Sequence, residues 1–314
     1  MTTAERILVR CEQAFGLTIL CFWLLERLAN GWWPVAILIC LPHLPSGLPL
    51  PLLTYVRLRV GWRGGGWLLL GWLIWLGGSG FRFNWQPGSA RPVRVVGYNL
   101  EGCPNGERAT SETLRSLQAD IYVLQEVAKW PLQGQPDLAY SATDSEFAVL
   151  SRYPVLSHRQ VQLQPERFSR PCQVVDLQLP GGPLRIINMH VSLLVHGPQW
   201  LYNQRHELRQ IVTQGLRDRD AQVANALPLI QGRCLVIGDF NGQPRDRSLA
   251  PLEARLLDSF RERGRGWGLS FESTLPVIRI DYIWHSPELR CLNCASIPSQ
   301  ASDHLPTQAE FADP

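Results

Sequence analysis

The sequence predicts an α/β domain with mixed β-sheets, preceded by a helical membrane anchor. Short runs rich in β-branched residues alternate with segments of helical period in the last two thirds of the chain. Two of these runs, residues 173–179 and 184–190, are separated by a short Pro- and Gly-rich turn, which is typical of a hairpin. The first 83 residues differ from the rest, because they contain long stretches without any charge.

Three apolar stretches in residues 1–83 are candidate membrane spans. Residues 64–81 carry no charge over 18 residues, which is long enough to cross a bilayer. Residues 28–56 also lack Asp, Glu, Lys and Arg, but five prolines predict a kink there. Residues 13–25 are shorter and would form a first span or a helix lying on the membrane. We therefore expect two or three spans, not a cleaved signal peptide, because the apolar sequence continues far beyond the usual length of one.

The arginines of this segment predict its orientation. Arg6 and Arg10 precede the first apolar stretch, and Arg57, Arg59 and Arg63 lie between the second and third. Both groups would be cytoplasmic by the positive-inside rule. The anchor is then multi-pass, and everything that follows it lies on the extracytoplasmic side.

A break rich in Pro, Gly and Ser at residues 84–92 is the expected linker, which leaves residues 93–314 as the domain. Seven arginines against three glutamates give residues 1–83 a net charge of +4, while the rest of the chain sums to −1. The domain therefore has no basic excess with which to bind a phosphate backbone, which weakens a nucleic-acid function without excluding it.

The elements of the domain are predicted in order from their periodicity. We expect helices over residues 108–118 and 200–216. The expected strands are residues 93–99, 121–125, 147–151, 173–179, 184–190, 235–237 and 278–284.

Polar side chains stand where these strands end. Each has an ordinary explanation alone, such as an Asx turn or a hydrogen-bonded core histidine. Together they are hard to explain as coincidence, because strand ends on a rigid scaffold carry functional sites. They are Asn99, Glu126, His190, Asp239, Asn241, Asp281, Asp303 and His304.

The chemistry of this set is consistent. Carboxylate and amide oxygens without clustered thiolates suit Mg²⁺ or Mn²⁺ rather than zinc. The single Cys291-x-x-Cys294 has no second pair and is weak evidence for zinc. Two histidines beside further aspartates suit proton transfer. No P-loop, G-x-S-x-G or cysteine-nucleophile signature is present, so the pattern indicates a metal-activated water attacking phosphorus.

Seven motifs in order carry a resemblance to a known family. They are "GYNL" (97–100), "ADIYVLQEV" (119–127), "FAVLSRYPV" (147–155), "INMHVS" (187–192), "GDFNGQP" (238–244), "RIDYIW" (279–284) and "SDHLP" (302–306). Together they resemble the endonuclease/exonuclease/phosphatase superfamily, which includes deoxyribonuclease I, abasic-site endonucleases, sphingomyelinases and inositol phosphatases. The resemblance implies a four-layer α/β sandwich, two mixed sheets face to face with helices outside.

The resemblance also implies a role for each matching residue. Glu126 would be the main metal ligand with Asn99 beside it, and Asp303 would approach the metal.

Asp239, helped by Asn241, would orient or deprotonate the attacking water. His304 would contact the scissile phosphate, and His190 would be a second histidine that donates a proton or contacts phosphate. Asp281 would hold a catalytic histidine in its working tautomer.

Three positions depart from the family pattern or have a second interpretation. Arg152 lies where some relatives have a phosphate-contacting side chain, but a surface arginine there is an equally good interpretation. Many relatives have Asn-Gly where this chain has Glu146-Phe147. Asn105 is a candidate for a second asparagine that many relatives carry, although Pro104 and Gly106 flank it.

Three functions remain open. The favoured one is a membrane-anchored, outward-facing phosphoesterase acting on a lipid-linked phosphate. Such an anchor resembles the bacterial glycopeptide-resistance branch of the superfamily, which implies a bacterial cell membrane and a phosphorylated polyprenyl substrate. The alternative is an anchored nuclease, with the basic, aromatic stretch 261–268 as a groove contact or simply a loop. A binding module without activity would lack a metal or acid–base residue, and none is missing.

Overall fold

The computed structural model forms two compact units, Met1–Phe81 and Arg82–Pro314. It describes residues 2–63, 65–84, 92–127, 138–164, 170–194 and 206–312. The expected helix over 200–216 lies partly outside these residues.

The first unit is helical throughout. Its α-helices are α1 (Thr3–Leu28), α2 (Trp33–Cys40), α3 (Pro49–Val60) and α4 (Gly66–Gly78), with a short 3₁₀ helix, η1 (Leu44–Gly47). α1 begins well before the expected apolar stretch because Thr2 and Glu5 form a reciprocal capping box at its N-terminus. Among the described residues, α1 alone is a single helix long and apolar enough to cross a membrane.

The two other expected spans differ from a simple helix. α2 and residues 45–60 would count as one span only as a bent pair, with 86° between the two parts. Prolines between them remove backbone donors and break the helical ladder. α4 has 13 residues, or roughly 20 Å of helix, which is shorter than a hydrocarbon core of about 30 Å.

Two charged side chains are enclosed between α1 and α3. Arg57 donates to both carboxylate oxygens of Glu12, and both side chains are completely buried. Arg57 also donates to the backbone carbonyls of Gly61 and Arg63 at 3.3 and 2.9 Å. The Glu12 carboxylate of α1 is therefore paired inside the helical unit and does not reach its outer surface.

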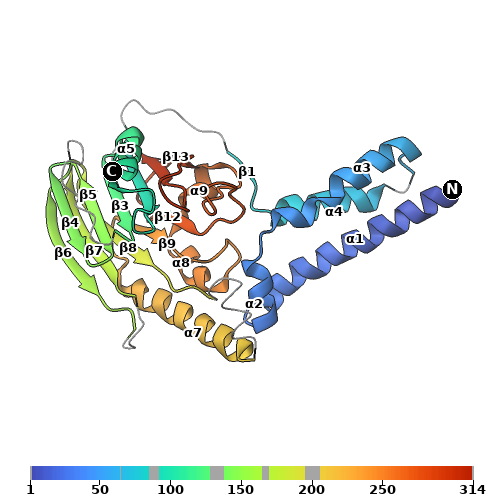
Figure 1. Ribbon diagram of the computed structural model, residues 1–314, viewed down its shortest axis with the longest axis horizontal. Coiled ribbons are helices and arrows are strands. Elements are labelled where there is room, and N and C mark those ends of the chain that lie inside the picture. Colours follow the sequence, from blue (N-terminus) through green and yellow to red (C-terminus); the bar gives the residue numbers. More distant parts are fainter. Residues whose placement is uncertain are drawn as a thin grey trace. The chain divides into compact units, whose positions relative to one another are not determined.

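The second unit contains two six-stranded sheets (Figure 1). In the first sheet the order is β13 (Cys291–Ser296), β14 (Thr307–Phe311), β2 (Val93–Asn99), β3 (Ile121–Gln125), β5 (Phe147–Ser151) and β4 (Tyr140–Asp144). In the second it is β10 (Leu257–Asp258), β12 (Asp281–His285), β9 (Cys234–Asp239), β8 (Gly182–His190), β7 (Cys172–Leu179) and β6 (Val155–Val161). Each sheet is mixed, because one neighbouring pair is parallel, β2–β3 or β8–β9, and the others are antiparallel.

The two sheets pack face to face, and the side-chain alternation of each strand decides which layer a residue enters. In β3, Val123 joins the core between the sheets, while its neighbour Leu124 packs on the outer face near α5 (Glu107–Leu117). In β8, Ile186 enters the same inner core, while Ile187 faces the layer containing α7 (Leu208–Ala226). Helix, sheet, sheet and helix form the four layers, and Figure 1 shows α5 and α7 on the opposite outer sides.

Small elements complete this unit. They are η2 (Leu227–Leu229), η3 (Arg247–Leu249), α8 (Ala250–Glu253), α9 (Ser259–Arg263) and the two-stranded pair β1 (Arg82–Phe83) with β11 (Arg265–Gly266). The stretch 261–268 is thus not simply a loop, since it contributes to α9 and β11. Asn84 donates to the carbonyls of Arg261 and Gly264, so the first residue of the expected linker is bound to the domain. Residues 85–91 lie outside the described residues.

Candidate active site

The strand ends of both sheets bring polar side chains to one edge of the sandwich. Asn99 lies opposite Gln125 in the parallel pair β2–β3. His190 lies opposite Asp239 in the parallel pair β8–β9, and Asp239 lies opposite Asp281 of β12. These five side chains occupy the inner faces of their strands. The same alternation that builds the apolar core therefore ends in polar residues at this edge.

Asp239 is at the centre of the cluster. Its carboxylate accepts hydrogen bonds from Asn99 Nδ2 at 3.1 Å, from the Asn241 backbone N–H at 2.8 Å and from Asn241 Nδ2 at 3.3 Å. Nε2 of His190 and Nε2 of His304 each lie 3.6 Å from Asp239 Oδ2. A 2 % exposed carboxylate thus faces four polar side chains from four different segments.

The glycine before Asp239 allows this arrangement. Gly238 has φ +151°, and a Cβ atom there would lie 1.8 Å from the carbonyl oxygen of Met189 on β8. A side chain at this position would push β9 away from β8. Gly97 has a similar function between the sheets, because its Cβ would lie 2.6 Å from Ile237.

Glu126 approaches the cluster through a turn at the end of β3. Its φ is +52°, a left-handed conformation that costs a non-glycine residue about 1–2 kcal/mol. Such strain is often found at functional sites. Its carboxylate accepts from Asn99 Nδ2 at 3.2 Å and lies 3.5 Å from Nε2 of His190.

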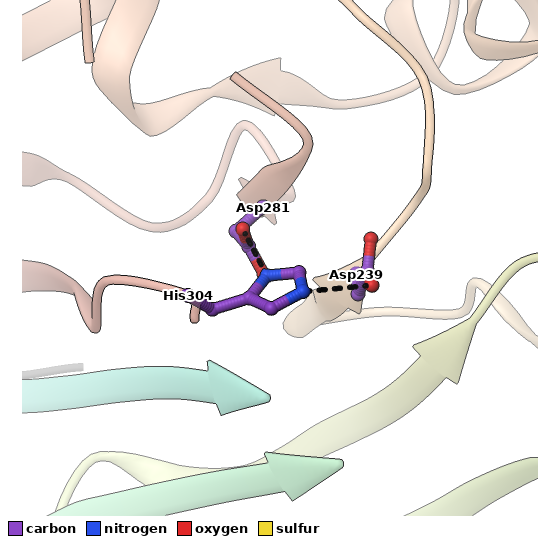
Figure 2. Close-up of side chains that lie close together, drawn as sticks. All are labelled: Asp239, Asp281 and His304. Carbon is purple, nitrogen blue, oxygen red and sulfur yellow. Dashed lines mark hydrogen bonds and ion pairs between the residues drawn. The ribbon is translucent and has the colours of Figure 1, made fainter. Parts of the chain in front are cut away.

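His304 lies between two aspartates (Figure 2). Its Nδ1 is 2.9 Å from Asp281 Oδ2, and its Nε2 points toward Asp239. Burial alone would lower the pKa of His304, but the charges of Asp281 and Asp239 raise this pKa to about 10. The imidazole is therefore held as a cation with its Nε2–H directed into the site.

His190 has partners that the sequence did not suggest. Its Nδ1 lies 3.2 Å from Glu146 Oε2, and the guanidinium of Arg170 contacts its ring. Burial opposes ionisation of Glu146, but the hydrogen bond and charge of His190 lower the pKa of this carboxyl below its usual value. The one available signal was Glu146 itself, a charged residue directly before a buried strand.

Asp303 lies at the margin of the cluster. Its Oδ1 is 3.8 Å from His304 Nε2, and its backbone N–H donates to Glu101. Burial is the main cause that raises the pKa of Asp303 to about 6. The neighbouring Ser302 hydroxyl donates to the carbonyl of Asn99 at 2.8 Å and so ties this loop to β2.

Two other candidates lie elsewhere. Arg152 follows the far end of β5 and pairs with Asp120 at 3.2 Å, so the structure does not bring it to the cluster. The alternative interpretation of Arg152 as a surface arginine fits its half-exposed side chain. Asn105 donates to the carbonyl of Gln300.

The donor set fits a hard divalent cation. Ligand atoms of Asp239, Asp281 and His304 lie within 4.8 Å of one another, and these residues are the one such group among the described parts of the chain. Glu126 adds a carboxylate beside Asp239. Asn99 links these two carboxylates through its Nδ2, while its Oδ1 accepts from the Glu101 backbone N–H. Carboxylate and amide oxygens of this kind suit Mg²⁺ or Mn²⁺. Cys291 and Cys294 are instead buried in β13 as free thiols.

A cleft of about 840 Å³ lies beside the cluster, and Ser302 and Asp303 line the part of it next to His304. Its lining includes four carboxylates and no Lys, Arg or His, and the carboxylates are Glu101, Glu112, Glu272 and Asp303. The potential in this cleft is therefore negative, although Arg108 pairs with Glu112 next to it.

The sequence profile of the "Endonuclease/Exonuclease/phosphatase family" matches residues 96–304. This match covers more than half of the chain, so the protein belongs to that family. A search of curated proteins finds no match. Members of the family are metal-dependent hydrolases of phosphoester bonds, and the chain carries the corresponding acidic cluster.

Solved structures with the same fold include three informative examples. An endonuclease/exonuclease/phosphatase from Bacteroides vulgatus is 16 % identical, with a TM-score of 0.58, over 71 % of this chain and all of the other. A functionally unknown conserved protein from Enterococcus faecalis is 17 % identical, with a TM-score of 0.55, over 70 % and 100 %. TDP2 of D. rerio complexed with a single-strand DNA product is 14 % identical, with a TM-score of 0.53, over 70 % and 99 %. At these identities the likeness establishes the fold.

Proposed function

We propose that this member of the endonuclease/exonuclease/phosphatase family is a membrane-anchored phosphoesterase that uses Mg²⁺ or Mn²⁺ to hydrolyse a lipid-linked phosphate ester or anhydride. One observation carries the membrane part of the proposal. Eighteen of the 24 large apolar side chains exposed among the described residues belong to residues 1–81, about a quarter of the chain. This unit presents apolar side chains outward and pairs Glu12 with Arg57 inside, which suits a lipid environment.

The main metal-binding residue would be Glu126, with Asn99 beside it and Asp303 close by. A bound Mg²⁺ or Mn²⁺ would lower the pKa of the attacking water and stabilise charge on the phosphoryl oxygens. Asn99 is suited to hold Glu126 and Asp239 together, since its amide already contacts both carboxylates.

Proton transfer would be divided between Asp239 and the two histidines. Asp239, held by Asn241, orients the water and accepts its proton. His304, kept cationic by Asp281, donates a hydrogen bond to a phosphate oxygen. His190 donates a proton to the leaving oxygen, while Glu146 fixes its ring and Arg170 adds positive charge for the phosphate.

The charge of the cleft supports the choice of substrate. A nucleic acid passing through it would bring successive phosphates beside Glu101 and Glu272, which repel them, whereas a lipid-linked phosphate would bring its charge to the metal site alone. The alternative function, an anchored nuclease, is favoured by the fold shared with the DNA-bound TDP2 structure. That likeness concerns the fold, whereas the carboxylates belong to this chain.

The same proposal includes an orientation. Residues 1–83 form the anchor, with Arg6, Arg10 and the arginines near residue 60 on the cytoplasmic side, and residues 93–314 lie outside. Protease added to intact spheroplasts should then cleave the domain. Cleavage only after lysis would contradict this orientation.

The decisive experiment uses the full chain purified in detergent with Mg²⁺. Phosphate release from undecaprenyl pyrophosphate is measured beside nicking of supercoiled DNA, with Asp239→Ala as the inactive control. Phosphate release that the mutation abolishes, without nicking, supports the lipid substrate. Asp239-dependent nicking without phosphate release would make the protein an anchored nuclease. Activity on neither would overturn both substrates and direct the search to small soluble phosphates.

A further inference from the structure

Three buried amide side chains cross the space between the two sheets directly beneath the candidate active site. They are Gln125 on β3, Asn188 on β8 and Gln173 on β7, and none is exposed to solvent. Their neighbours in this layer are apolar, so the amides form a polar path through an otherwise hydrophobic core. None of them is among the site residues that the sequence predicts, although Gln125 lies opposite Asn99 at the same edge.

The path is continuous through hydrogen bonds. Gln125 Nε2 donates to Asn188 Oδ1 at 2.7 Å, and Asn188 Nδ2 donates to the carbonyl of Leu124 at 2.9 Å. Asn188 Nδ2 also donates to Gln173 Oε1 at 3.2 Å, and Gln173 Nε2 donates to the carbonyl of Ala142 at 3.1 Å. β3 and β4 of the first sheet are thus bound to β8 and β7 of the second.

The first link of this path stands next to two site residues. Gln125 directly precedes Glu126, and Asn188 precedes His190 by two positions on the same face of β8. Glu126 and His190 come from different sheets, yet their side chains are only 3.5 Å apart. No covalent bond and no backbone-to-backbone hydrogen bond joins β3 to β8, which lie in separate sheets, although the Asn188 side chain reaches the Leu124 carbonyl. The spacing of the two site residues therefore depends on contacts between side chains of the two sheets.

We propose that the Gln125–Asn188 pair is a positioning device that fixes Glu126 against His190 across the two sheets. Apolar packing limits movement of the sheets through shape alone, because hydrophobic attraction has no direction. An amide–amide hydrogen bond restricts both distance and angle. The inference rests on the proposed roles of Glu126 and His190.

The hydrogen bonding of Gln125 supports a functional reason for the pair. Its Oε1 is buried and has no hydrogen-bond partner in the part of the chain that the structure describes. A buried acceptor without a partner costs stability, so two apolar residues of similar size would serve the core better. Selection for stability alone does not account for this glutamine, whereas a role in positioning Glu126 at the end of β3 does.

The test compares near-isosteric variants of the full chain in detergent. Gln125→Met and Asn188→Leu remove the link, while Gln173→Met removes an equally buried amide of the same path but keeps the link. Mn²⁺ affinity is read from the electron paramagnetic resonance signal of free Mn²⁺, alongside the melting temperature and kcat. We expect the first two variants to weaken Mn²⁺ binding and lower kcat by about tenfold, as supporting residues of metal sites do. Gln173→Met should lower the melting temperature and change the other two quantities less than about twofold.

A length exchange keeps the test decisive if a single variant folds poorly. Gln125→Asn with Asn188→Gln shortens one amide and lengthens the other, and should recover Mn²⁺ affinity relative to either single change. Equal losses of melting temperature in all variants, with unchanged Mn²⁺ affinity and kcat, would overturn the proposal. Glu126→Gln in the same titration tests the proposed function separately: unchanged Mn²⁺ binding there would reject the role of Glu126, whatever the amide variants show.

Discussion

Nδ1 of His304 lies 2.9 Å from Oδ2 of Asp281, and both side chains are almost completely buried. Among the described partners of Asp281, His304 is the one basic side chain. The negative charge of Asp281 therefore acts mainly on this imidazole. The pairing fixes both the orientation and the charge of the ring. It is the clearest electrostatic feature of the site, and it makes a prediction that needs no substrate.

The raised pKa of His304 predicts that the metal-free protein loses stability as the pH rises. The unfolded chain releases this proton near pH 6.5, and the folded chain near pH 10. Between these values the folded state holds a proton that the unfolded state has lost, so raising the pH favours unfolding. The melting temperature in EDTA should therefore fall from about pH 6.5 upward. Asp281→Asn removes a carboxylate that raises this pKa. The fall should then still begin near pH 6.5 but end at a lower pH and be smaller, whereas a flat profile in the wild type would contradict the prediction.

Replacing Asp239 by Asn should abolish most activity while leaving the fold intact. Asn keeps the shape of the side chain but cannot accept a proton, and general base catalysis contributes about 10²- to 10⁴-fold. We expect kcat/KM on bis(p-nitrophenyl) phosphate to fall by at least about 100-fold. Asp220→Asn, on the exposed face of α7, is the matched control and should retain activity. A loss of less than about tenfold in Asp239→Asn would exclude Asp239 as the base.

Arg170 and Arg152 should respond differently to the same substitution. Arg170 contacts His190 and lies 3.9 Å from Glu146, while Arg152 pairs with Asp120 at the opposite end of its sheet. Lysine keeps the charge but not the planar guanidinium, so Arg170→Lys should reduce kcat/KM by about tenfold. Arg152→Lys should leave it unchanged. Equal effects of the two changes would rule out a specific phosphate contact by Arg170.

The stability of the protein should depend on a buried ion pair that holds the loop after Asp239. Arg219 on α7 is completely buried, contacts Asp246 at 2.7 Å and donates to the carbonyl of Phe240. Arg219→Met leaves the Asp246 carboxylate buried without its cation, which costs about 3 kcal/mol. The melting temperature should fall by roughly 10 °C. Arg108→Ala removes an exposed pair and should change nothing; a similar fall in both would show that Arg219 has no special role.

Several elements of the fold could be predicted from local sequence because their signals are local. β2, β3 and β5 begin and end at the expected residues, since each is an apolar run bounded by polar or turn residues. β4 and β6 could not be found in this way. They are edge strands with polar, largely exposed side chains, and their strand structure depends on pairing with a neighbour.

The ends of α7 could not be predicted from local sequence either. A helix over 200–216 was expected, but α7 begins at Leu208 and continues to Ala226. The added turns bury Val223 and Ala226 against the second sheet. This tertiary packing stabilises a stretch whose polar composition gives a weak signal.

The sequence by itself determined that carboxylate, amide and imidazole side chains stand at strand ends. It also indicated the apolar first segment, because charge-free length is a property of the chain alone. The alternation of side chains is local, so the inner-face positions of Asn99, His190 and Asp239 follow from the strand pattern.

Only the tertiary structure decided which of these groups meet. Glu146 and Arg170 precede β5 and β7, and His190 ends β8. They share no spacing or motif, yet the packing of these strands brings them together. The same packing leaves Arg152 at the far end of β5, although it lies in a matching motif. Strand order, strand direction and the register between sheets set these distances. They arise from contacts between residues far apart in sequence, which no local pattern records.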